Sequence, residues 1–307
     1  MSYARITRAA LTALALLALS ACGASTAAPT AAKPTVVATT TQLEDVLAVI
    51  GGERIAVVGL VPRNGDPHEF EPTPEHAKQI AASQAVFKNG AGLEGWIDEL
   101  VANAGGERPI FDTTKGLALS TIGSAFEEGG ETDPHVWFDP TLMQGVVDNV
   151  AAGLRQIDPG GAATFDANAA AYKQQLAELD AYAKQTLASI PAERRKLVTA
   201  HDAMGYFAKR YGFEVVGAVI PSVSTEAADT SAKQLAELVE KIKAAGVPAV
   251  FAEASNNPKF VEQLGAEAGV KVVEDLYVDS LGAKGSEADT YLKFFRADVD
   301  KITAALK

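Results

Sequence analysis

The segment Asp133-Pro-His-Val-Trp-Phe-Asp-Pro140 holds one of the four histidines of the chain between two prolines and two aspartates. The tripeptide Asp-Pro-His also occurs upstream, in Asn64-Gly-Asp-Pro-His-Glu-Phe-Glu-Pro72. A proline before the histidine fixes φ and pushes the preceding aspartate into an extended conformation. The imidazole is therefore presented from a stiff loop, with a carboxylate close enough to accept its second ring N–H, as a metal-ligating histidine needs. One copy alone is compatible with an ordinary loop histidine, whereas two copies with the same flanking residues favour a metal-binding site.

The composition is that of an acidic globular protein. The chain has 307 residues, of which 48% are apolar and 21% charged, and its formal net charge is −12. This length is enough for two compact α/β lobes or one large domain. The negative charge argues against nucleic acid or an anionic membrane surface as the partner, and it suits the attraction of cations.

The N-terminal residues are expected to lie outside the fold. Arg5 and Arg8 precede an apolar run over 9–19, which is too short to span a bilayer but is typical of a secretory signal peptide. The run ends at Leu19-Ser-Ala-Cys22, which resembles a bacterial lipobox, and Cys22 is the only cysteine of the chain. We therefore expect a signal peptide over 1–21, a lipid anchor on Cys22, a low-complexity tether over 22–34 and an extracytoplasmic location on a bacterial membrane.

Strands and helices are expected to alternate along the rest of the chain. This alternation is typical of βαβ units with a parallel sheet, and the acidic stretch 113–132 is expected to be a loop. The longest periodic run, over 165–190, predicts one helix of about seven turns, which is either a core helix or a strut joining two lobes. Apolar runs predict strands over 35–40, 54–61, 85–88, 109–112, 196–200, 214–220, 250–252 and 271–273.

Three histidines are expected in loops just after strands, namely His68, His135 and His201. Ligands of open parallel α/β sheets bind outside the carboxyl ends of the strands, so these three side chains can face one crevice. His76 does not fit this pattern, because it lies on an expected helix among charged residues and is expected at the surface.

A fourth ligand is expected from the last loop that follows a strand. Asp279 in Tyr277-Val-Asp-Ser-Leu281 is the best placed, and Asp275 and Glu274 are its competitors. Three imidazoles and a carboxylate suit zinc, whereas sets richer in oxygen suit manganese. Binding requires neutral imidazoles, so the affinity is expected to fall as the pH drops through about 6.5.

Sequence signatures of enzymes are missing. The chain has no His-Glu-x-x-His, no Gly-x-Ser-x-Gly, no phosphate-binding Gly-rich loop and no cysteine pair. Four protein ligands also leave no position for an activated water, which favours carrying the metal over catalysis with it. We therefore expect a receptor and not an enzyme. The alternatives from other classes are a secreted zinc hydrolase with Asp279 as general base, and a surface adhesin that is stabilised by its metal.

Four motifs resemble those of the zinc/manganese family of metal-binding solute-binding lipoproteins of ABC importers, and the resemblance extends from the lipobox to the C-terminus. It implies two α/β lobes, each with a parallel sheet flanked by helices, over 35–160 and 192–307, joined by one long rigid helix over 161–191. Such a helix predicts small lobe motions. The motifs are Gly65-Asp-Pro-His-Glu-Phe-Glu-Pro72, Asp133-Pro-His-Val-Trp-Phe-Asp-Pro140, His201-Asp-Ala-Met-Gly-Tyr-Phe207 and Val278-Asp-Ser280.

The resemblance also implies the ligands and the partners. His68 and His135 would come from the first lobe, and His201 and Asp279 from the second. In members that resemble manganese binders the third ligand is a glutamate, so His201 favours Zn²⁺, with Mn²⁺ as the alternative. Many zinc-binding relatives carry a histidine-rich loop before the second ligand histidine, but the corresponding segment here, 126–132, has no histidine.

The expected partners are the membrane permease of an ABC importer and its cytoplasmic ATPase, and we expect a monomer.

Overall fold

The computed structural model describes residues 32–122, 131–223, 225, 231–254 and 258–307. The expected signal peptide, Cys22, nearly all of the tether and most of the acidic stretch 126–131 lie outside these described residues. From Lys33 onward the chain forms one compact unit. Among the described residues, no helix combines the length and the apolar character that crossing a bilayer requires.

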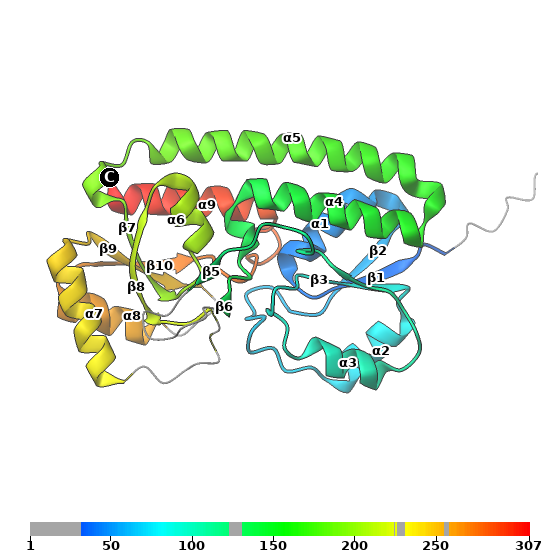
Figure 1. The fold of residues 1–307 in the computed structure, drawn as a ribbon, viewed down its shortest axis with the longest axis horizontal. Helices are drawn as coiled ribbons and strands as arrows, with labels where there is room; N and C mark the ends of the chain where they lie inside the picture. The colour runs from blue at the N-terminus through cyan, green and yellow to red at the C-terminus, as the bar shows by residue number, and fades with distance from the viewer. Residues whose placement is uncertain (1–31, 123–130, 224, 226–230, 255–257) are drawn as a thin grey trace, which may run out of the picture. The chain divides into compact units, whose positions relative to one another are not determined.

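The first half is built on a parallel sheet with helices on both faces (Figure 1). Its central strand is fully buried from Val36 to Ala38, because one face packs against α2 and α3 and the other against α1 and α4. The sheet order is β2 (Ala56–Gly59), β1 (Thr35–Ala38), β3 (Ala85–Lys88) and β4 (Ile110–Asp112). The helices are α1 (Thr41–Gly51), α2 (Pro74–Ala82), α3 (Ile97–Ala104) and α4 (Pro140–Ile157).

The second half repeats the alternation with two parallel pairs of strands, β7–β8 and β9–β10, in which β7 lies beside β9. Helices α7 and α8 pack on one side of these strands. The strands are β7 (Lys196–His201), β8 (Glu214–Ile220), β9 (Ala249–Glu253) and β10 (Lys271–Leu276). The helices are α6 (Gly205–Tyr211), α7 (Ala232–Ala245), α8 (Lys259–Ala268) and α9 (Tyr291–Leu306).

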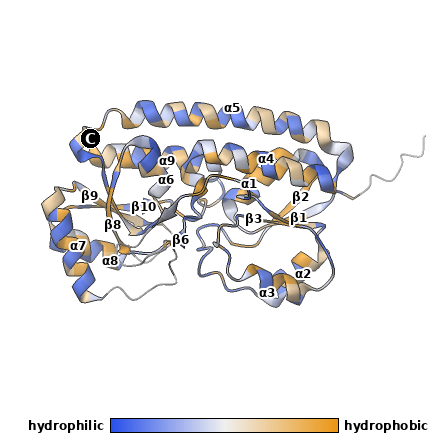
Figure 2. Cartoon of the chain, viewed as in Figure 1, coloured by the Kyte–Doolittle hydropathy of each residue, from blue (hydrophilic) through white to orange (hydrophobic). Residues whose placement is uncertain are grey.

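One long helix, α5 (Ala162–Leu187), stands between the two halves in the sequence. Its 26 residues correspond to about 39 Å at 1.5 Å per residue, and it packs on α4, α1 and α9. Figure 1 shows α5 running above α4 and α9, and Figure 2 shows hydrophobic and hydrophilic residues alternating along it. The buried stripe is Phe165, Ala169, Tyr172, Leu176, Leu179, Ala183 and Leu187, as the periodicity predicts. The predicted fold class, two α/β halves joined by a long helix, is therefore confirmed.

The helix layer formed by α1, α4, α5 and α9 gives the two halves a shared hydrophobic core. Trp137 and Phe138 from the first half lie in the same buried cluster as Tyr291 and Phe294 from α9. The Tyr291 hydroxyl also donates a hydrogen bond to the Trp137 carbonyl, with an O–O distance of 2.7 Å. Packing of this extent, continuous through both halves, opposes a wide hinge motion and agrees with the small lobe motions expected from the long helix.

The stretch expected to be a loop contains one short antiparallel pair, β5 (Thr121–Ile122) with β6 (Glu131–Thr132). Two-residue strands are too short to produce a periodic pattern in the sequence. Within the described part of the chain there are also four short 3₁₀ turns, at Gly52–Arg54, Val136–Phe138, Pro159–Gly161 and Ala192–Arg194.

Candidate metal centre

The structure brings together the four residues that the sequence singled out. One ligand atom from each of His68, His135, His201 and Asp279 lies within 4.8 Å of the others, and all four residues are buried. His201 ends β7, Asp279 follows β10, His68 follows β2, and His135 lies between the short strand β6 and α4.

The competitors for the fourth position do not belong to this cluster. Asp275 and Glu274 are exposed on β10, upstream of Asp279. His76 also lies elsewhere: its Nδ1 atom accepts the backbone N–H of Thr73 at 2.9 Å and so caps the start of α2. It is half-buried against Phe70, with 4.9 Å between ring centroids, so the expectation of a solvated surface histidine was too simple.

The distances within the cluster suit a single ion. The Nε2 atom of His135 is 3.2 Å from that of His201 and 3.4 Å from that of His68. The nearest oxygens of Asp279 lie 3.5 Å, 3.6 Å and 3.9 Å from Nε2 of His201, His135 and His68. Four ligands at 2.0–2.1 Å from a tetrahedral ion would be separated by about 3.3–3.4 Å. The distances of 3.2–3.9 Å between these atoms are close to this spacing.

The surroundings of the Asp279 carboxylate suit the binding of a cation. The residue is 1% exposed, and among the described residues neither of its oxygens has a hydrogen-bond partner. A buried carboxylate without hydrogen bonds is costly unless a cation or proton compensates its charge. A divalent ion held by the three imidazoles would supply that compensation.

Two of the imidazoles are held from behind by buried carboxylates. Asp133 Oδ1 accepts the Nδ1–H of His135 at 2.8 Å and its backbone N–H at 3.0 Å. Glu253 Oε1 accepts the Nδ1–H of His201 at 2.7 Å and its backbone N–H at 3.1 Å. In the neutral rings that bind a metal, these bonds fix the tautomer in which Nε2 carries the free lone pair and faces the cluster.

Glu253 is the residue that sequence reasoning missed. The signal was present, because Glu253 is a charged residue at the end of an otherwise apolar strand that the structure buries throughout. Its partner His201 lies 52 residues earlier, so only the pairing of strands in space brings the two together.

At His68 the preceding aspartate contacts the main chain of the histidine, and not its ring N–H as expected. Asp66 Oδ1 accepts the backbone N–H of His68 at 2.8 Å, and its Oδ2 accepts the hydroxyl of Thr225 at 2.8 Å. The Trp96 indole donates a hydrogen bond to the Pro67 carbonyl at 2.9 Å. The main chain around His68 is thus fixed, and Asp66 connects it to the second half of the chain.

The three imidazoles have different proton affinities. Burial, followed by the charges of His135 and His201, lowers the pKa of His68 to about 2. Burial and His201 also hold the pKa of His135 well below its usual value. Burial would lower the pKa of His201 too, but Glu253 and Asp279 outweigh it and raise the value to about 10. The three pKa values thus lie on both sides of the unperturbed 6.5 on which the expected pH dependence was based, and His201 is the imidazole that holds a proton near neutral pH.

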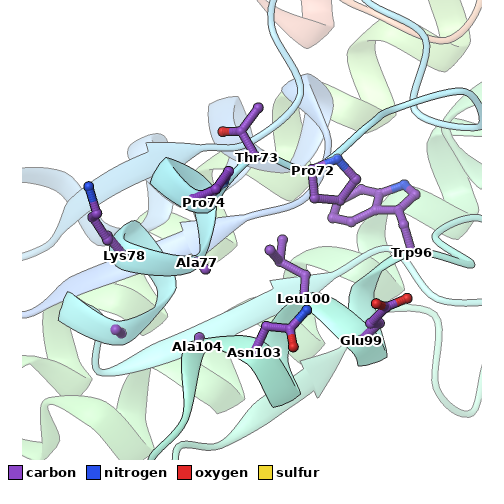
Figure 3. Close-up of a pocket in the computed structure, with 11 residues that line it drawn as sticks. Pro72, Thr73, Pro74, Ala77, Lys78, Trp96, Glu99, Leu100, Asn103 and Ala104 are labelled. Atoms are coloured by element: carbon purple, nitrogen blue, oxygen red, sulfur yellow. The ribbon is translucent and has the colours of Figure 1, made fainter.

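A pocket of about 460 Å³ leads toward the cluster, and of the four clustered residues it is His68 that lines it. Glu131, Thr132, Pro134 and Val223 are among its walls. A larger groove of about 630 Å³ lies between α2 and α3 (Figure 3). Its lining includes Trp96 and Leu100 but none of the four clustered residues, so it is separate from this centre.

A buried set of three imidazoles and one carboxylate, between two α/β halves that a long helix joins, defines a metal-binding receptor. The chain belongs to the family described as zinc-uptake complex component A, periplasmic, whose model matches residues 36–305. Members of this family are substrate-binding receptors of ABC transporters, so the prediction of a receptor and not an enzyme is confirmed.

Some similar proteins are named as manganese-binding and others as zinc-binding. The chain is 32% identical over 271 residues to the manganese-binding lipoprotein MntA of Halalkalibacterium halodurans, covering 88% of each chain. It is 32% identical over 279 residues to the manganese ABC transporter substrate-binding lipoprotein PsaA of Streptococcus pneumoniae, again covering 88% of each. The solved periplasmic zinc-binding protein TroA of Treponema pallidum is 35% identical with a TM-score of 0.81, covering 89% of this chain and 99% of that one. Relatives that are lipoproteins and periplasmic proteins agree with the extracytoplasmic, lipid-anchored location expected from the sequence.

Proposed function

We propose that this protein captures a divalent metal ion with His68, His135, His201 and Asp279 and delivers it to the membrane permease of an ABC importer with a cytoplasmic ATPase. The observation that carries the proposal is the buried carboxylate of Asp279. Without a hydrogen-bond partner among the described residues, it lies 3.5–3.9 Å from three imidazole Nε2 atoms. This arrangement is stabilised by a cation at its centre.

Zn²⁺ is the proposed cargo in preference to Mn²⁺. Three nitrogen donors and one carboxylate favour zinc in both ligand type and number, whereas manganese prefers oxygen and more ligands. The similarity to a zinc-binding TroA at 35% identity supports zinc, and the similarity to manganese-binding lipoproteins at 32% makes manganese the alternative.

The proposed organisation follows from this function. Lobes over 35–160 and 192–307 would each supply two ligands, and the segment 161–191 around α5 would hold them at a nearly fixed separation. A diacylated Cys22 would anchor a monomer to the membrane, and the tether over 22–34 would let it reach the permease.

The test is a competition titration of residues 23–307 after removal of metal with a chelator. We expect one Zn²⁺ per chain, bound reversibly and more tightly than Mn²⁺, and we expect the Asp279→Ala variant to lose this binding. Tighter binding of Mn²⁺ would retain the receptor and overturn the cargo. Absence of stoichiometric, reversible binding of either ion would refute the proposed function.

A further inference from the structure

Glu253 occupies an unusual place for a carboxylate. It is the last residue of β9 and is only 3% exposed. A single oxygen of Glu253 accepts both N–H groups of His201, from the ring at 2.7 Å and from the main chain at 3.1 Å. The Thr199 hydroxyl meanwhile donates to the His201 carbonyl at 2.6 Å, so the main chain of this residue is held on both sides.

The opposite edge of the same ring faces the cluster. The Nε2 atom of His201 lies 3.5 Å from Asp279 Oδ2 and 3.2 Å from Nε2 of His135. The imidazole therefore stands between two carboxylates, one behind it on Nδ1 and one beside the position of the ion. Rotation or a change of tautomer would leave the buried Glu253 oxygen without the Nδ1–H that it accepts.

When a carboxylate accepts the Nδ1–H of an imidazole, the Nε2 atom becomes more basic and donates its electron pair more strongly to a metal ion. A stronger nitrogen donor does not favour all metals equally. Mn²⁺ stands at the weak end of the affinity order for such ligands and prefers oxygen, whereas Zn²⁺ gains more from each imidazole. The charge of Glu253 thus adds more to the binding of zinc than to the binding of manganese.

We propose that Glu253 is a positioning residue that sets the preference of the centre for zinc over manganese, by orienting and polarising His201. The proposal deepens the proposed function and rests on it, because it concerns the same cluster. Glu253 is not one of the four clustered residues; it acts through His201 from a different strand.

The test compares Glu253→Gln with Glu274→Gln, the same chemical change at an exposed position of β10. In Glu253→Gln we expect the affinity for Zn²⁺ to fall about 10–100-fold, as is typical for loss of an outer carboxylate, and that for Mn²⁺ to fall less than about tenfold. The ratio of the two affinities then shrinks, and the visible absorption of bound Co²⁺ changes because the donor at His201 has weakened. Glu274→Gln should retain the wild-type ratio and spectrum.

An unchanged zinc-to-manganese ratio in Glu253→Gln would overturn the proposal, even if both affinities fell together. If that variant does not fold, Glu253→Asp provides the same test, because it keeps the charge but withdraws it from Nδ1. A reduced ratio is again expected, and an unchanged one contradicts the proposal. Failure of the proposed function is distinguishable, because in that case the wild-type protein itself would bind neither ion stoichiometrically.

Discussion

The two Asp-Pro-His loops have the same three residues but use their aspartates differently. In both, one aspartate oxygen accepts the backbone N–H of the histidine two residues later, at 2.8 Å for His68 and 3.0 Å for His135. Only in the second loop does that oxygen also accept the ring Nδ1–H. In the first loop the other oxygen accepts a hydroxyl from Thr225 instead. The tripeptide determines the turn of the main chain, and the neighbours in space determine what the side chains do.

The loops also differ in how tryptophan supports them. The Trp96 indole donates to the Pro67 carbonyl within the first loop, and this side chain is half-buried at the groove between α2 and α3. Trp137, inside the second segment, donates to the Val278 carbonyl at 2.8 Å and is 1% exposed. It thereby fixes the residue next to Asp279 and connects the two halves. The buried indole thus packs in the core and holds its loop by this hydrogen bond.

The sharpest test of the comparison is the pair Asp133→Asn and Asp66→Asn. Asparagine keeps an acceptor for the backbone N–H in both loops but removes the charge. We expect the affinity for Zn²⁺ to fall about 10–100-fold in Asp133→Asn, which loses the carboxylate behind a ligand imidazole, and less than about tenfold in Asp66→Asn. Competition titration of both variants measures this. Equal losses would mean that the two aspartates act alike in spite of their different contacts.

The second test is the dependence of zinc affinity on pH. Of the three clustered imidazoles, only His201 is protonated near neutral pH, because its pKa is raised to about 10 while those of His68 and His135 are lowered. Burial also raises the pKa of the Asp279 carboxyl well above its usual value. Zinc must displace the proton of His201 and any proton on Asp279, so we expect the affinity to rise at least about tenfold per pH unit from pH 6 to 9, with at least one proton released per ion. Titrations in buffers of different ionisation enthalpy count the protons. An affinity that does not change between pH 6 and 9 would contradict the raised pKa of His201.

The smallest effects are expected from Trp137→Phe and Trp96→Phe, measured as the free energy of unfolding of the metal-free protein. Trp137→Phe leaves the buried Val278 carbonyl without its donor and should cost about 2–3 kcal/mol, including lost packing. Trp96→Phe removes a hydrogen bond that is only part-buried and should cost about 0.5–1.5 kcal/mol. A reversed order would contradict the view that the second loop is the more deeply integrated one.

Local patterns were sufficient for most of the fold. Strand β8 begins and ends at the predicted residues, Glu214 and Ile220, and α5 buries the stripe that its periodicity predicts. Strand β2 is shorter than the predicted 54–61 at both ends, and a 3₁₀ turn over Gly52–Arg54, which propensity does not indicate, precedes it. The pairing of β5 with β6 was missed because two residues carry no period.

By itself, the sequence determined that the chain alternates strands and helices, that one helix is unusually long, and that three histidines and an aspartate follow strand ends. These are properties of neighbouring residues, and periodicity and loop chemistry express them directly. The tertiary structure decided which carboxylate stands behind each imidazole. Glu253 and His201 are 52 residues apart, and Asp66 and Thr225 are 159 apart. No local pattern encodes such pairs, because they form only when separate strands and loops pack into one buried centre, where every polar group must find a partner.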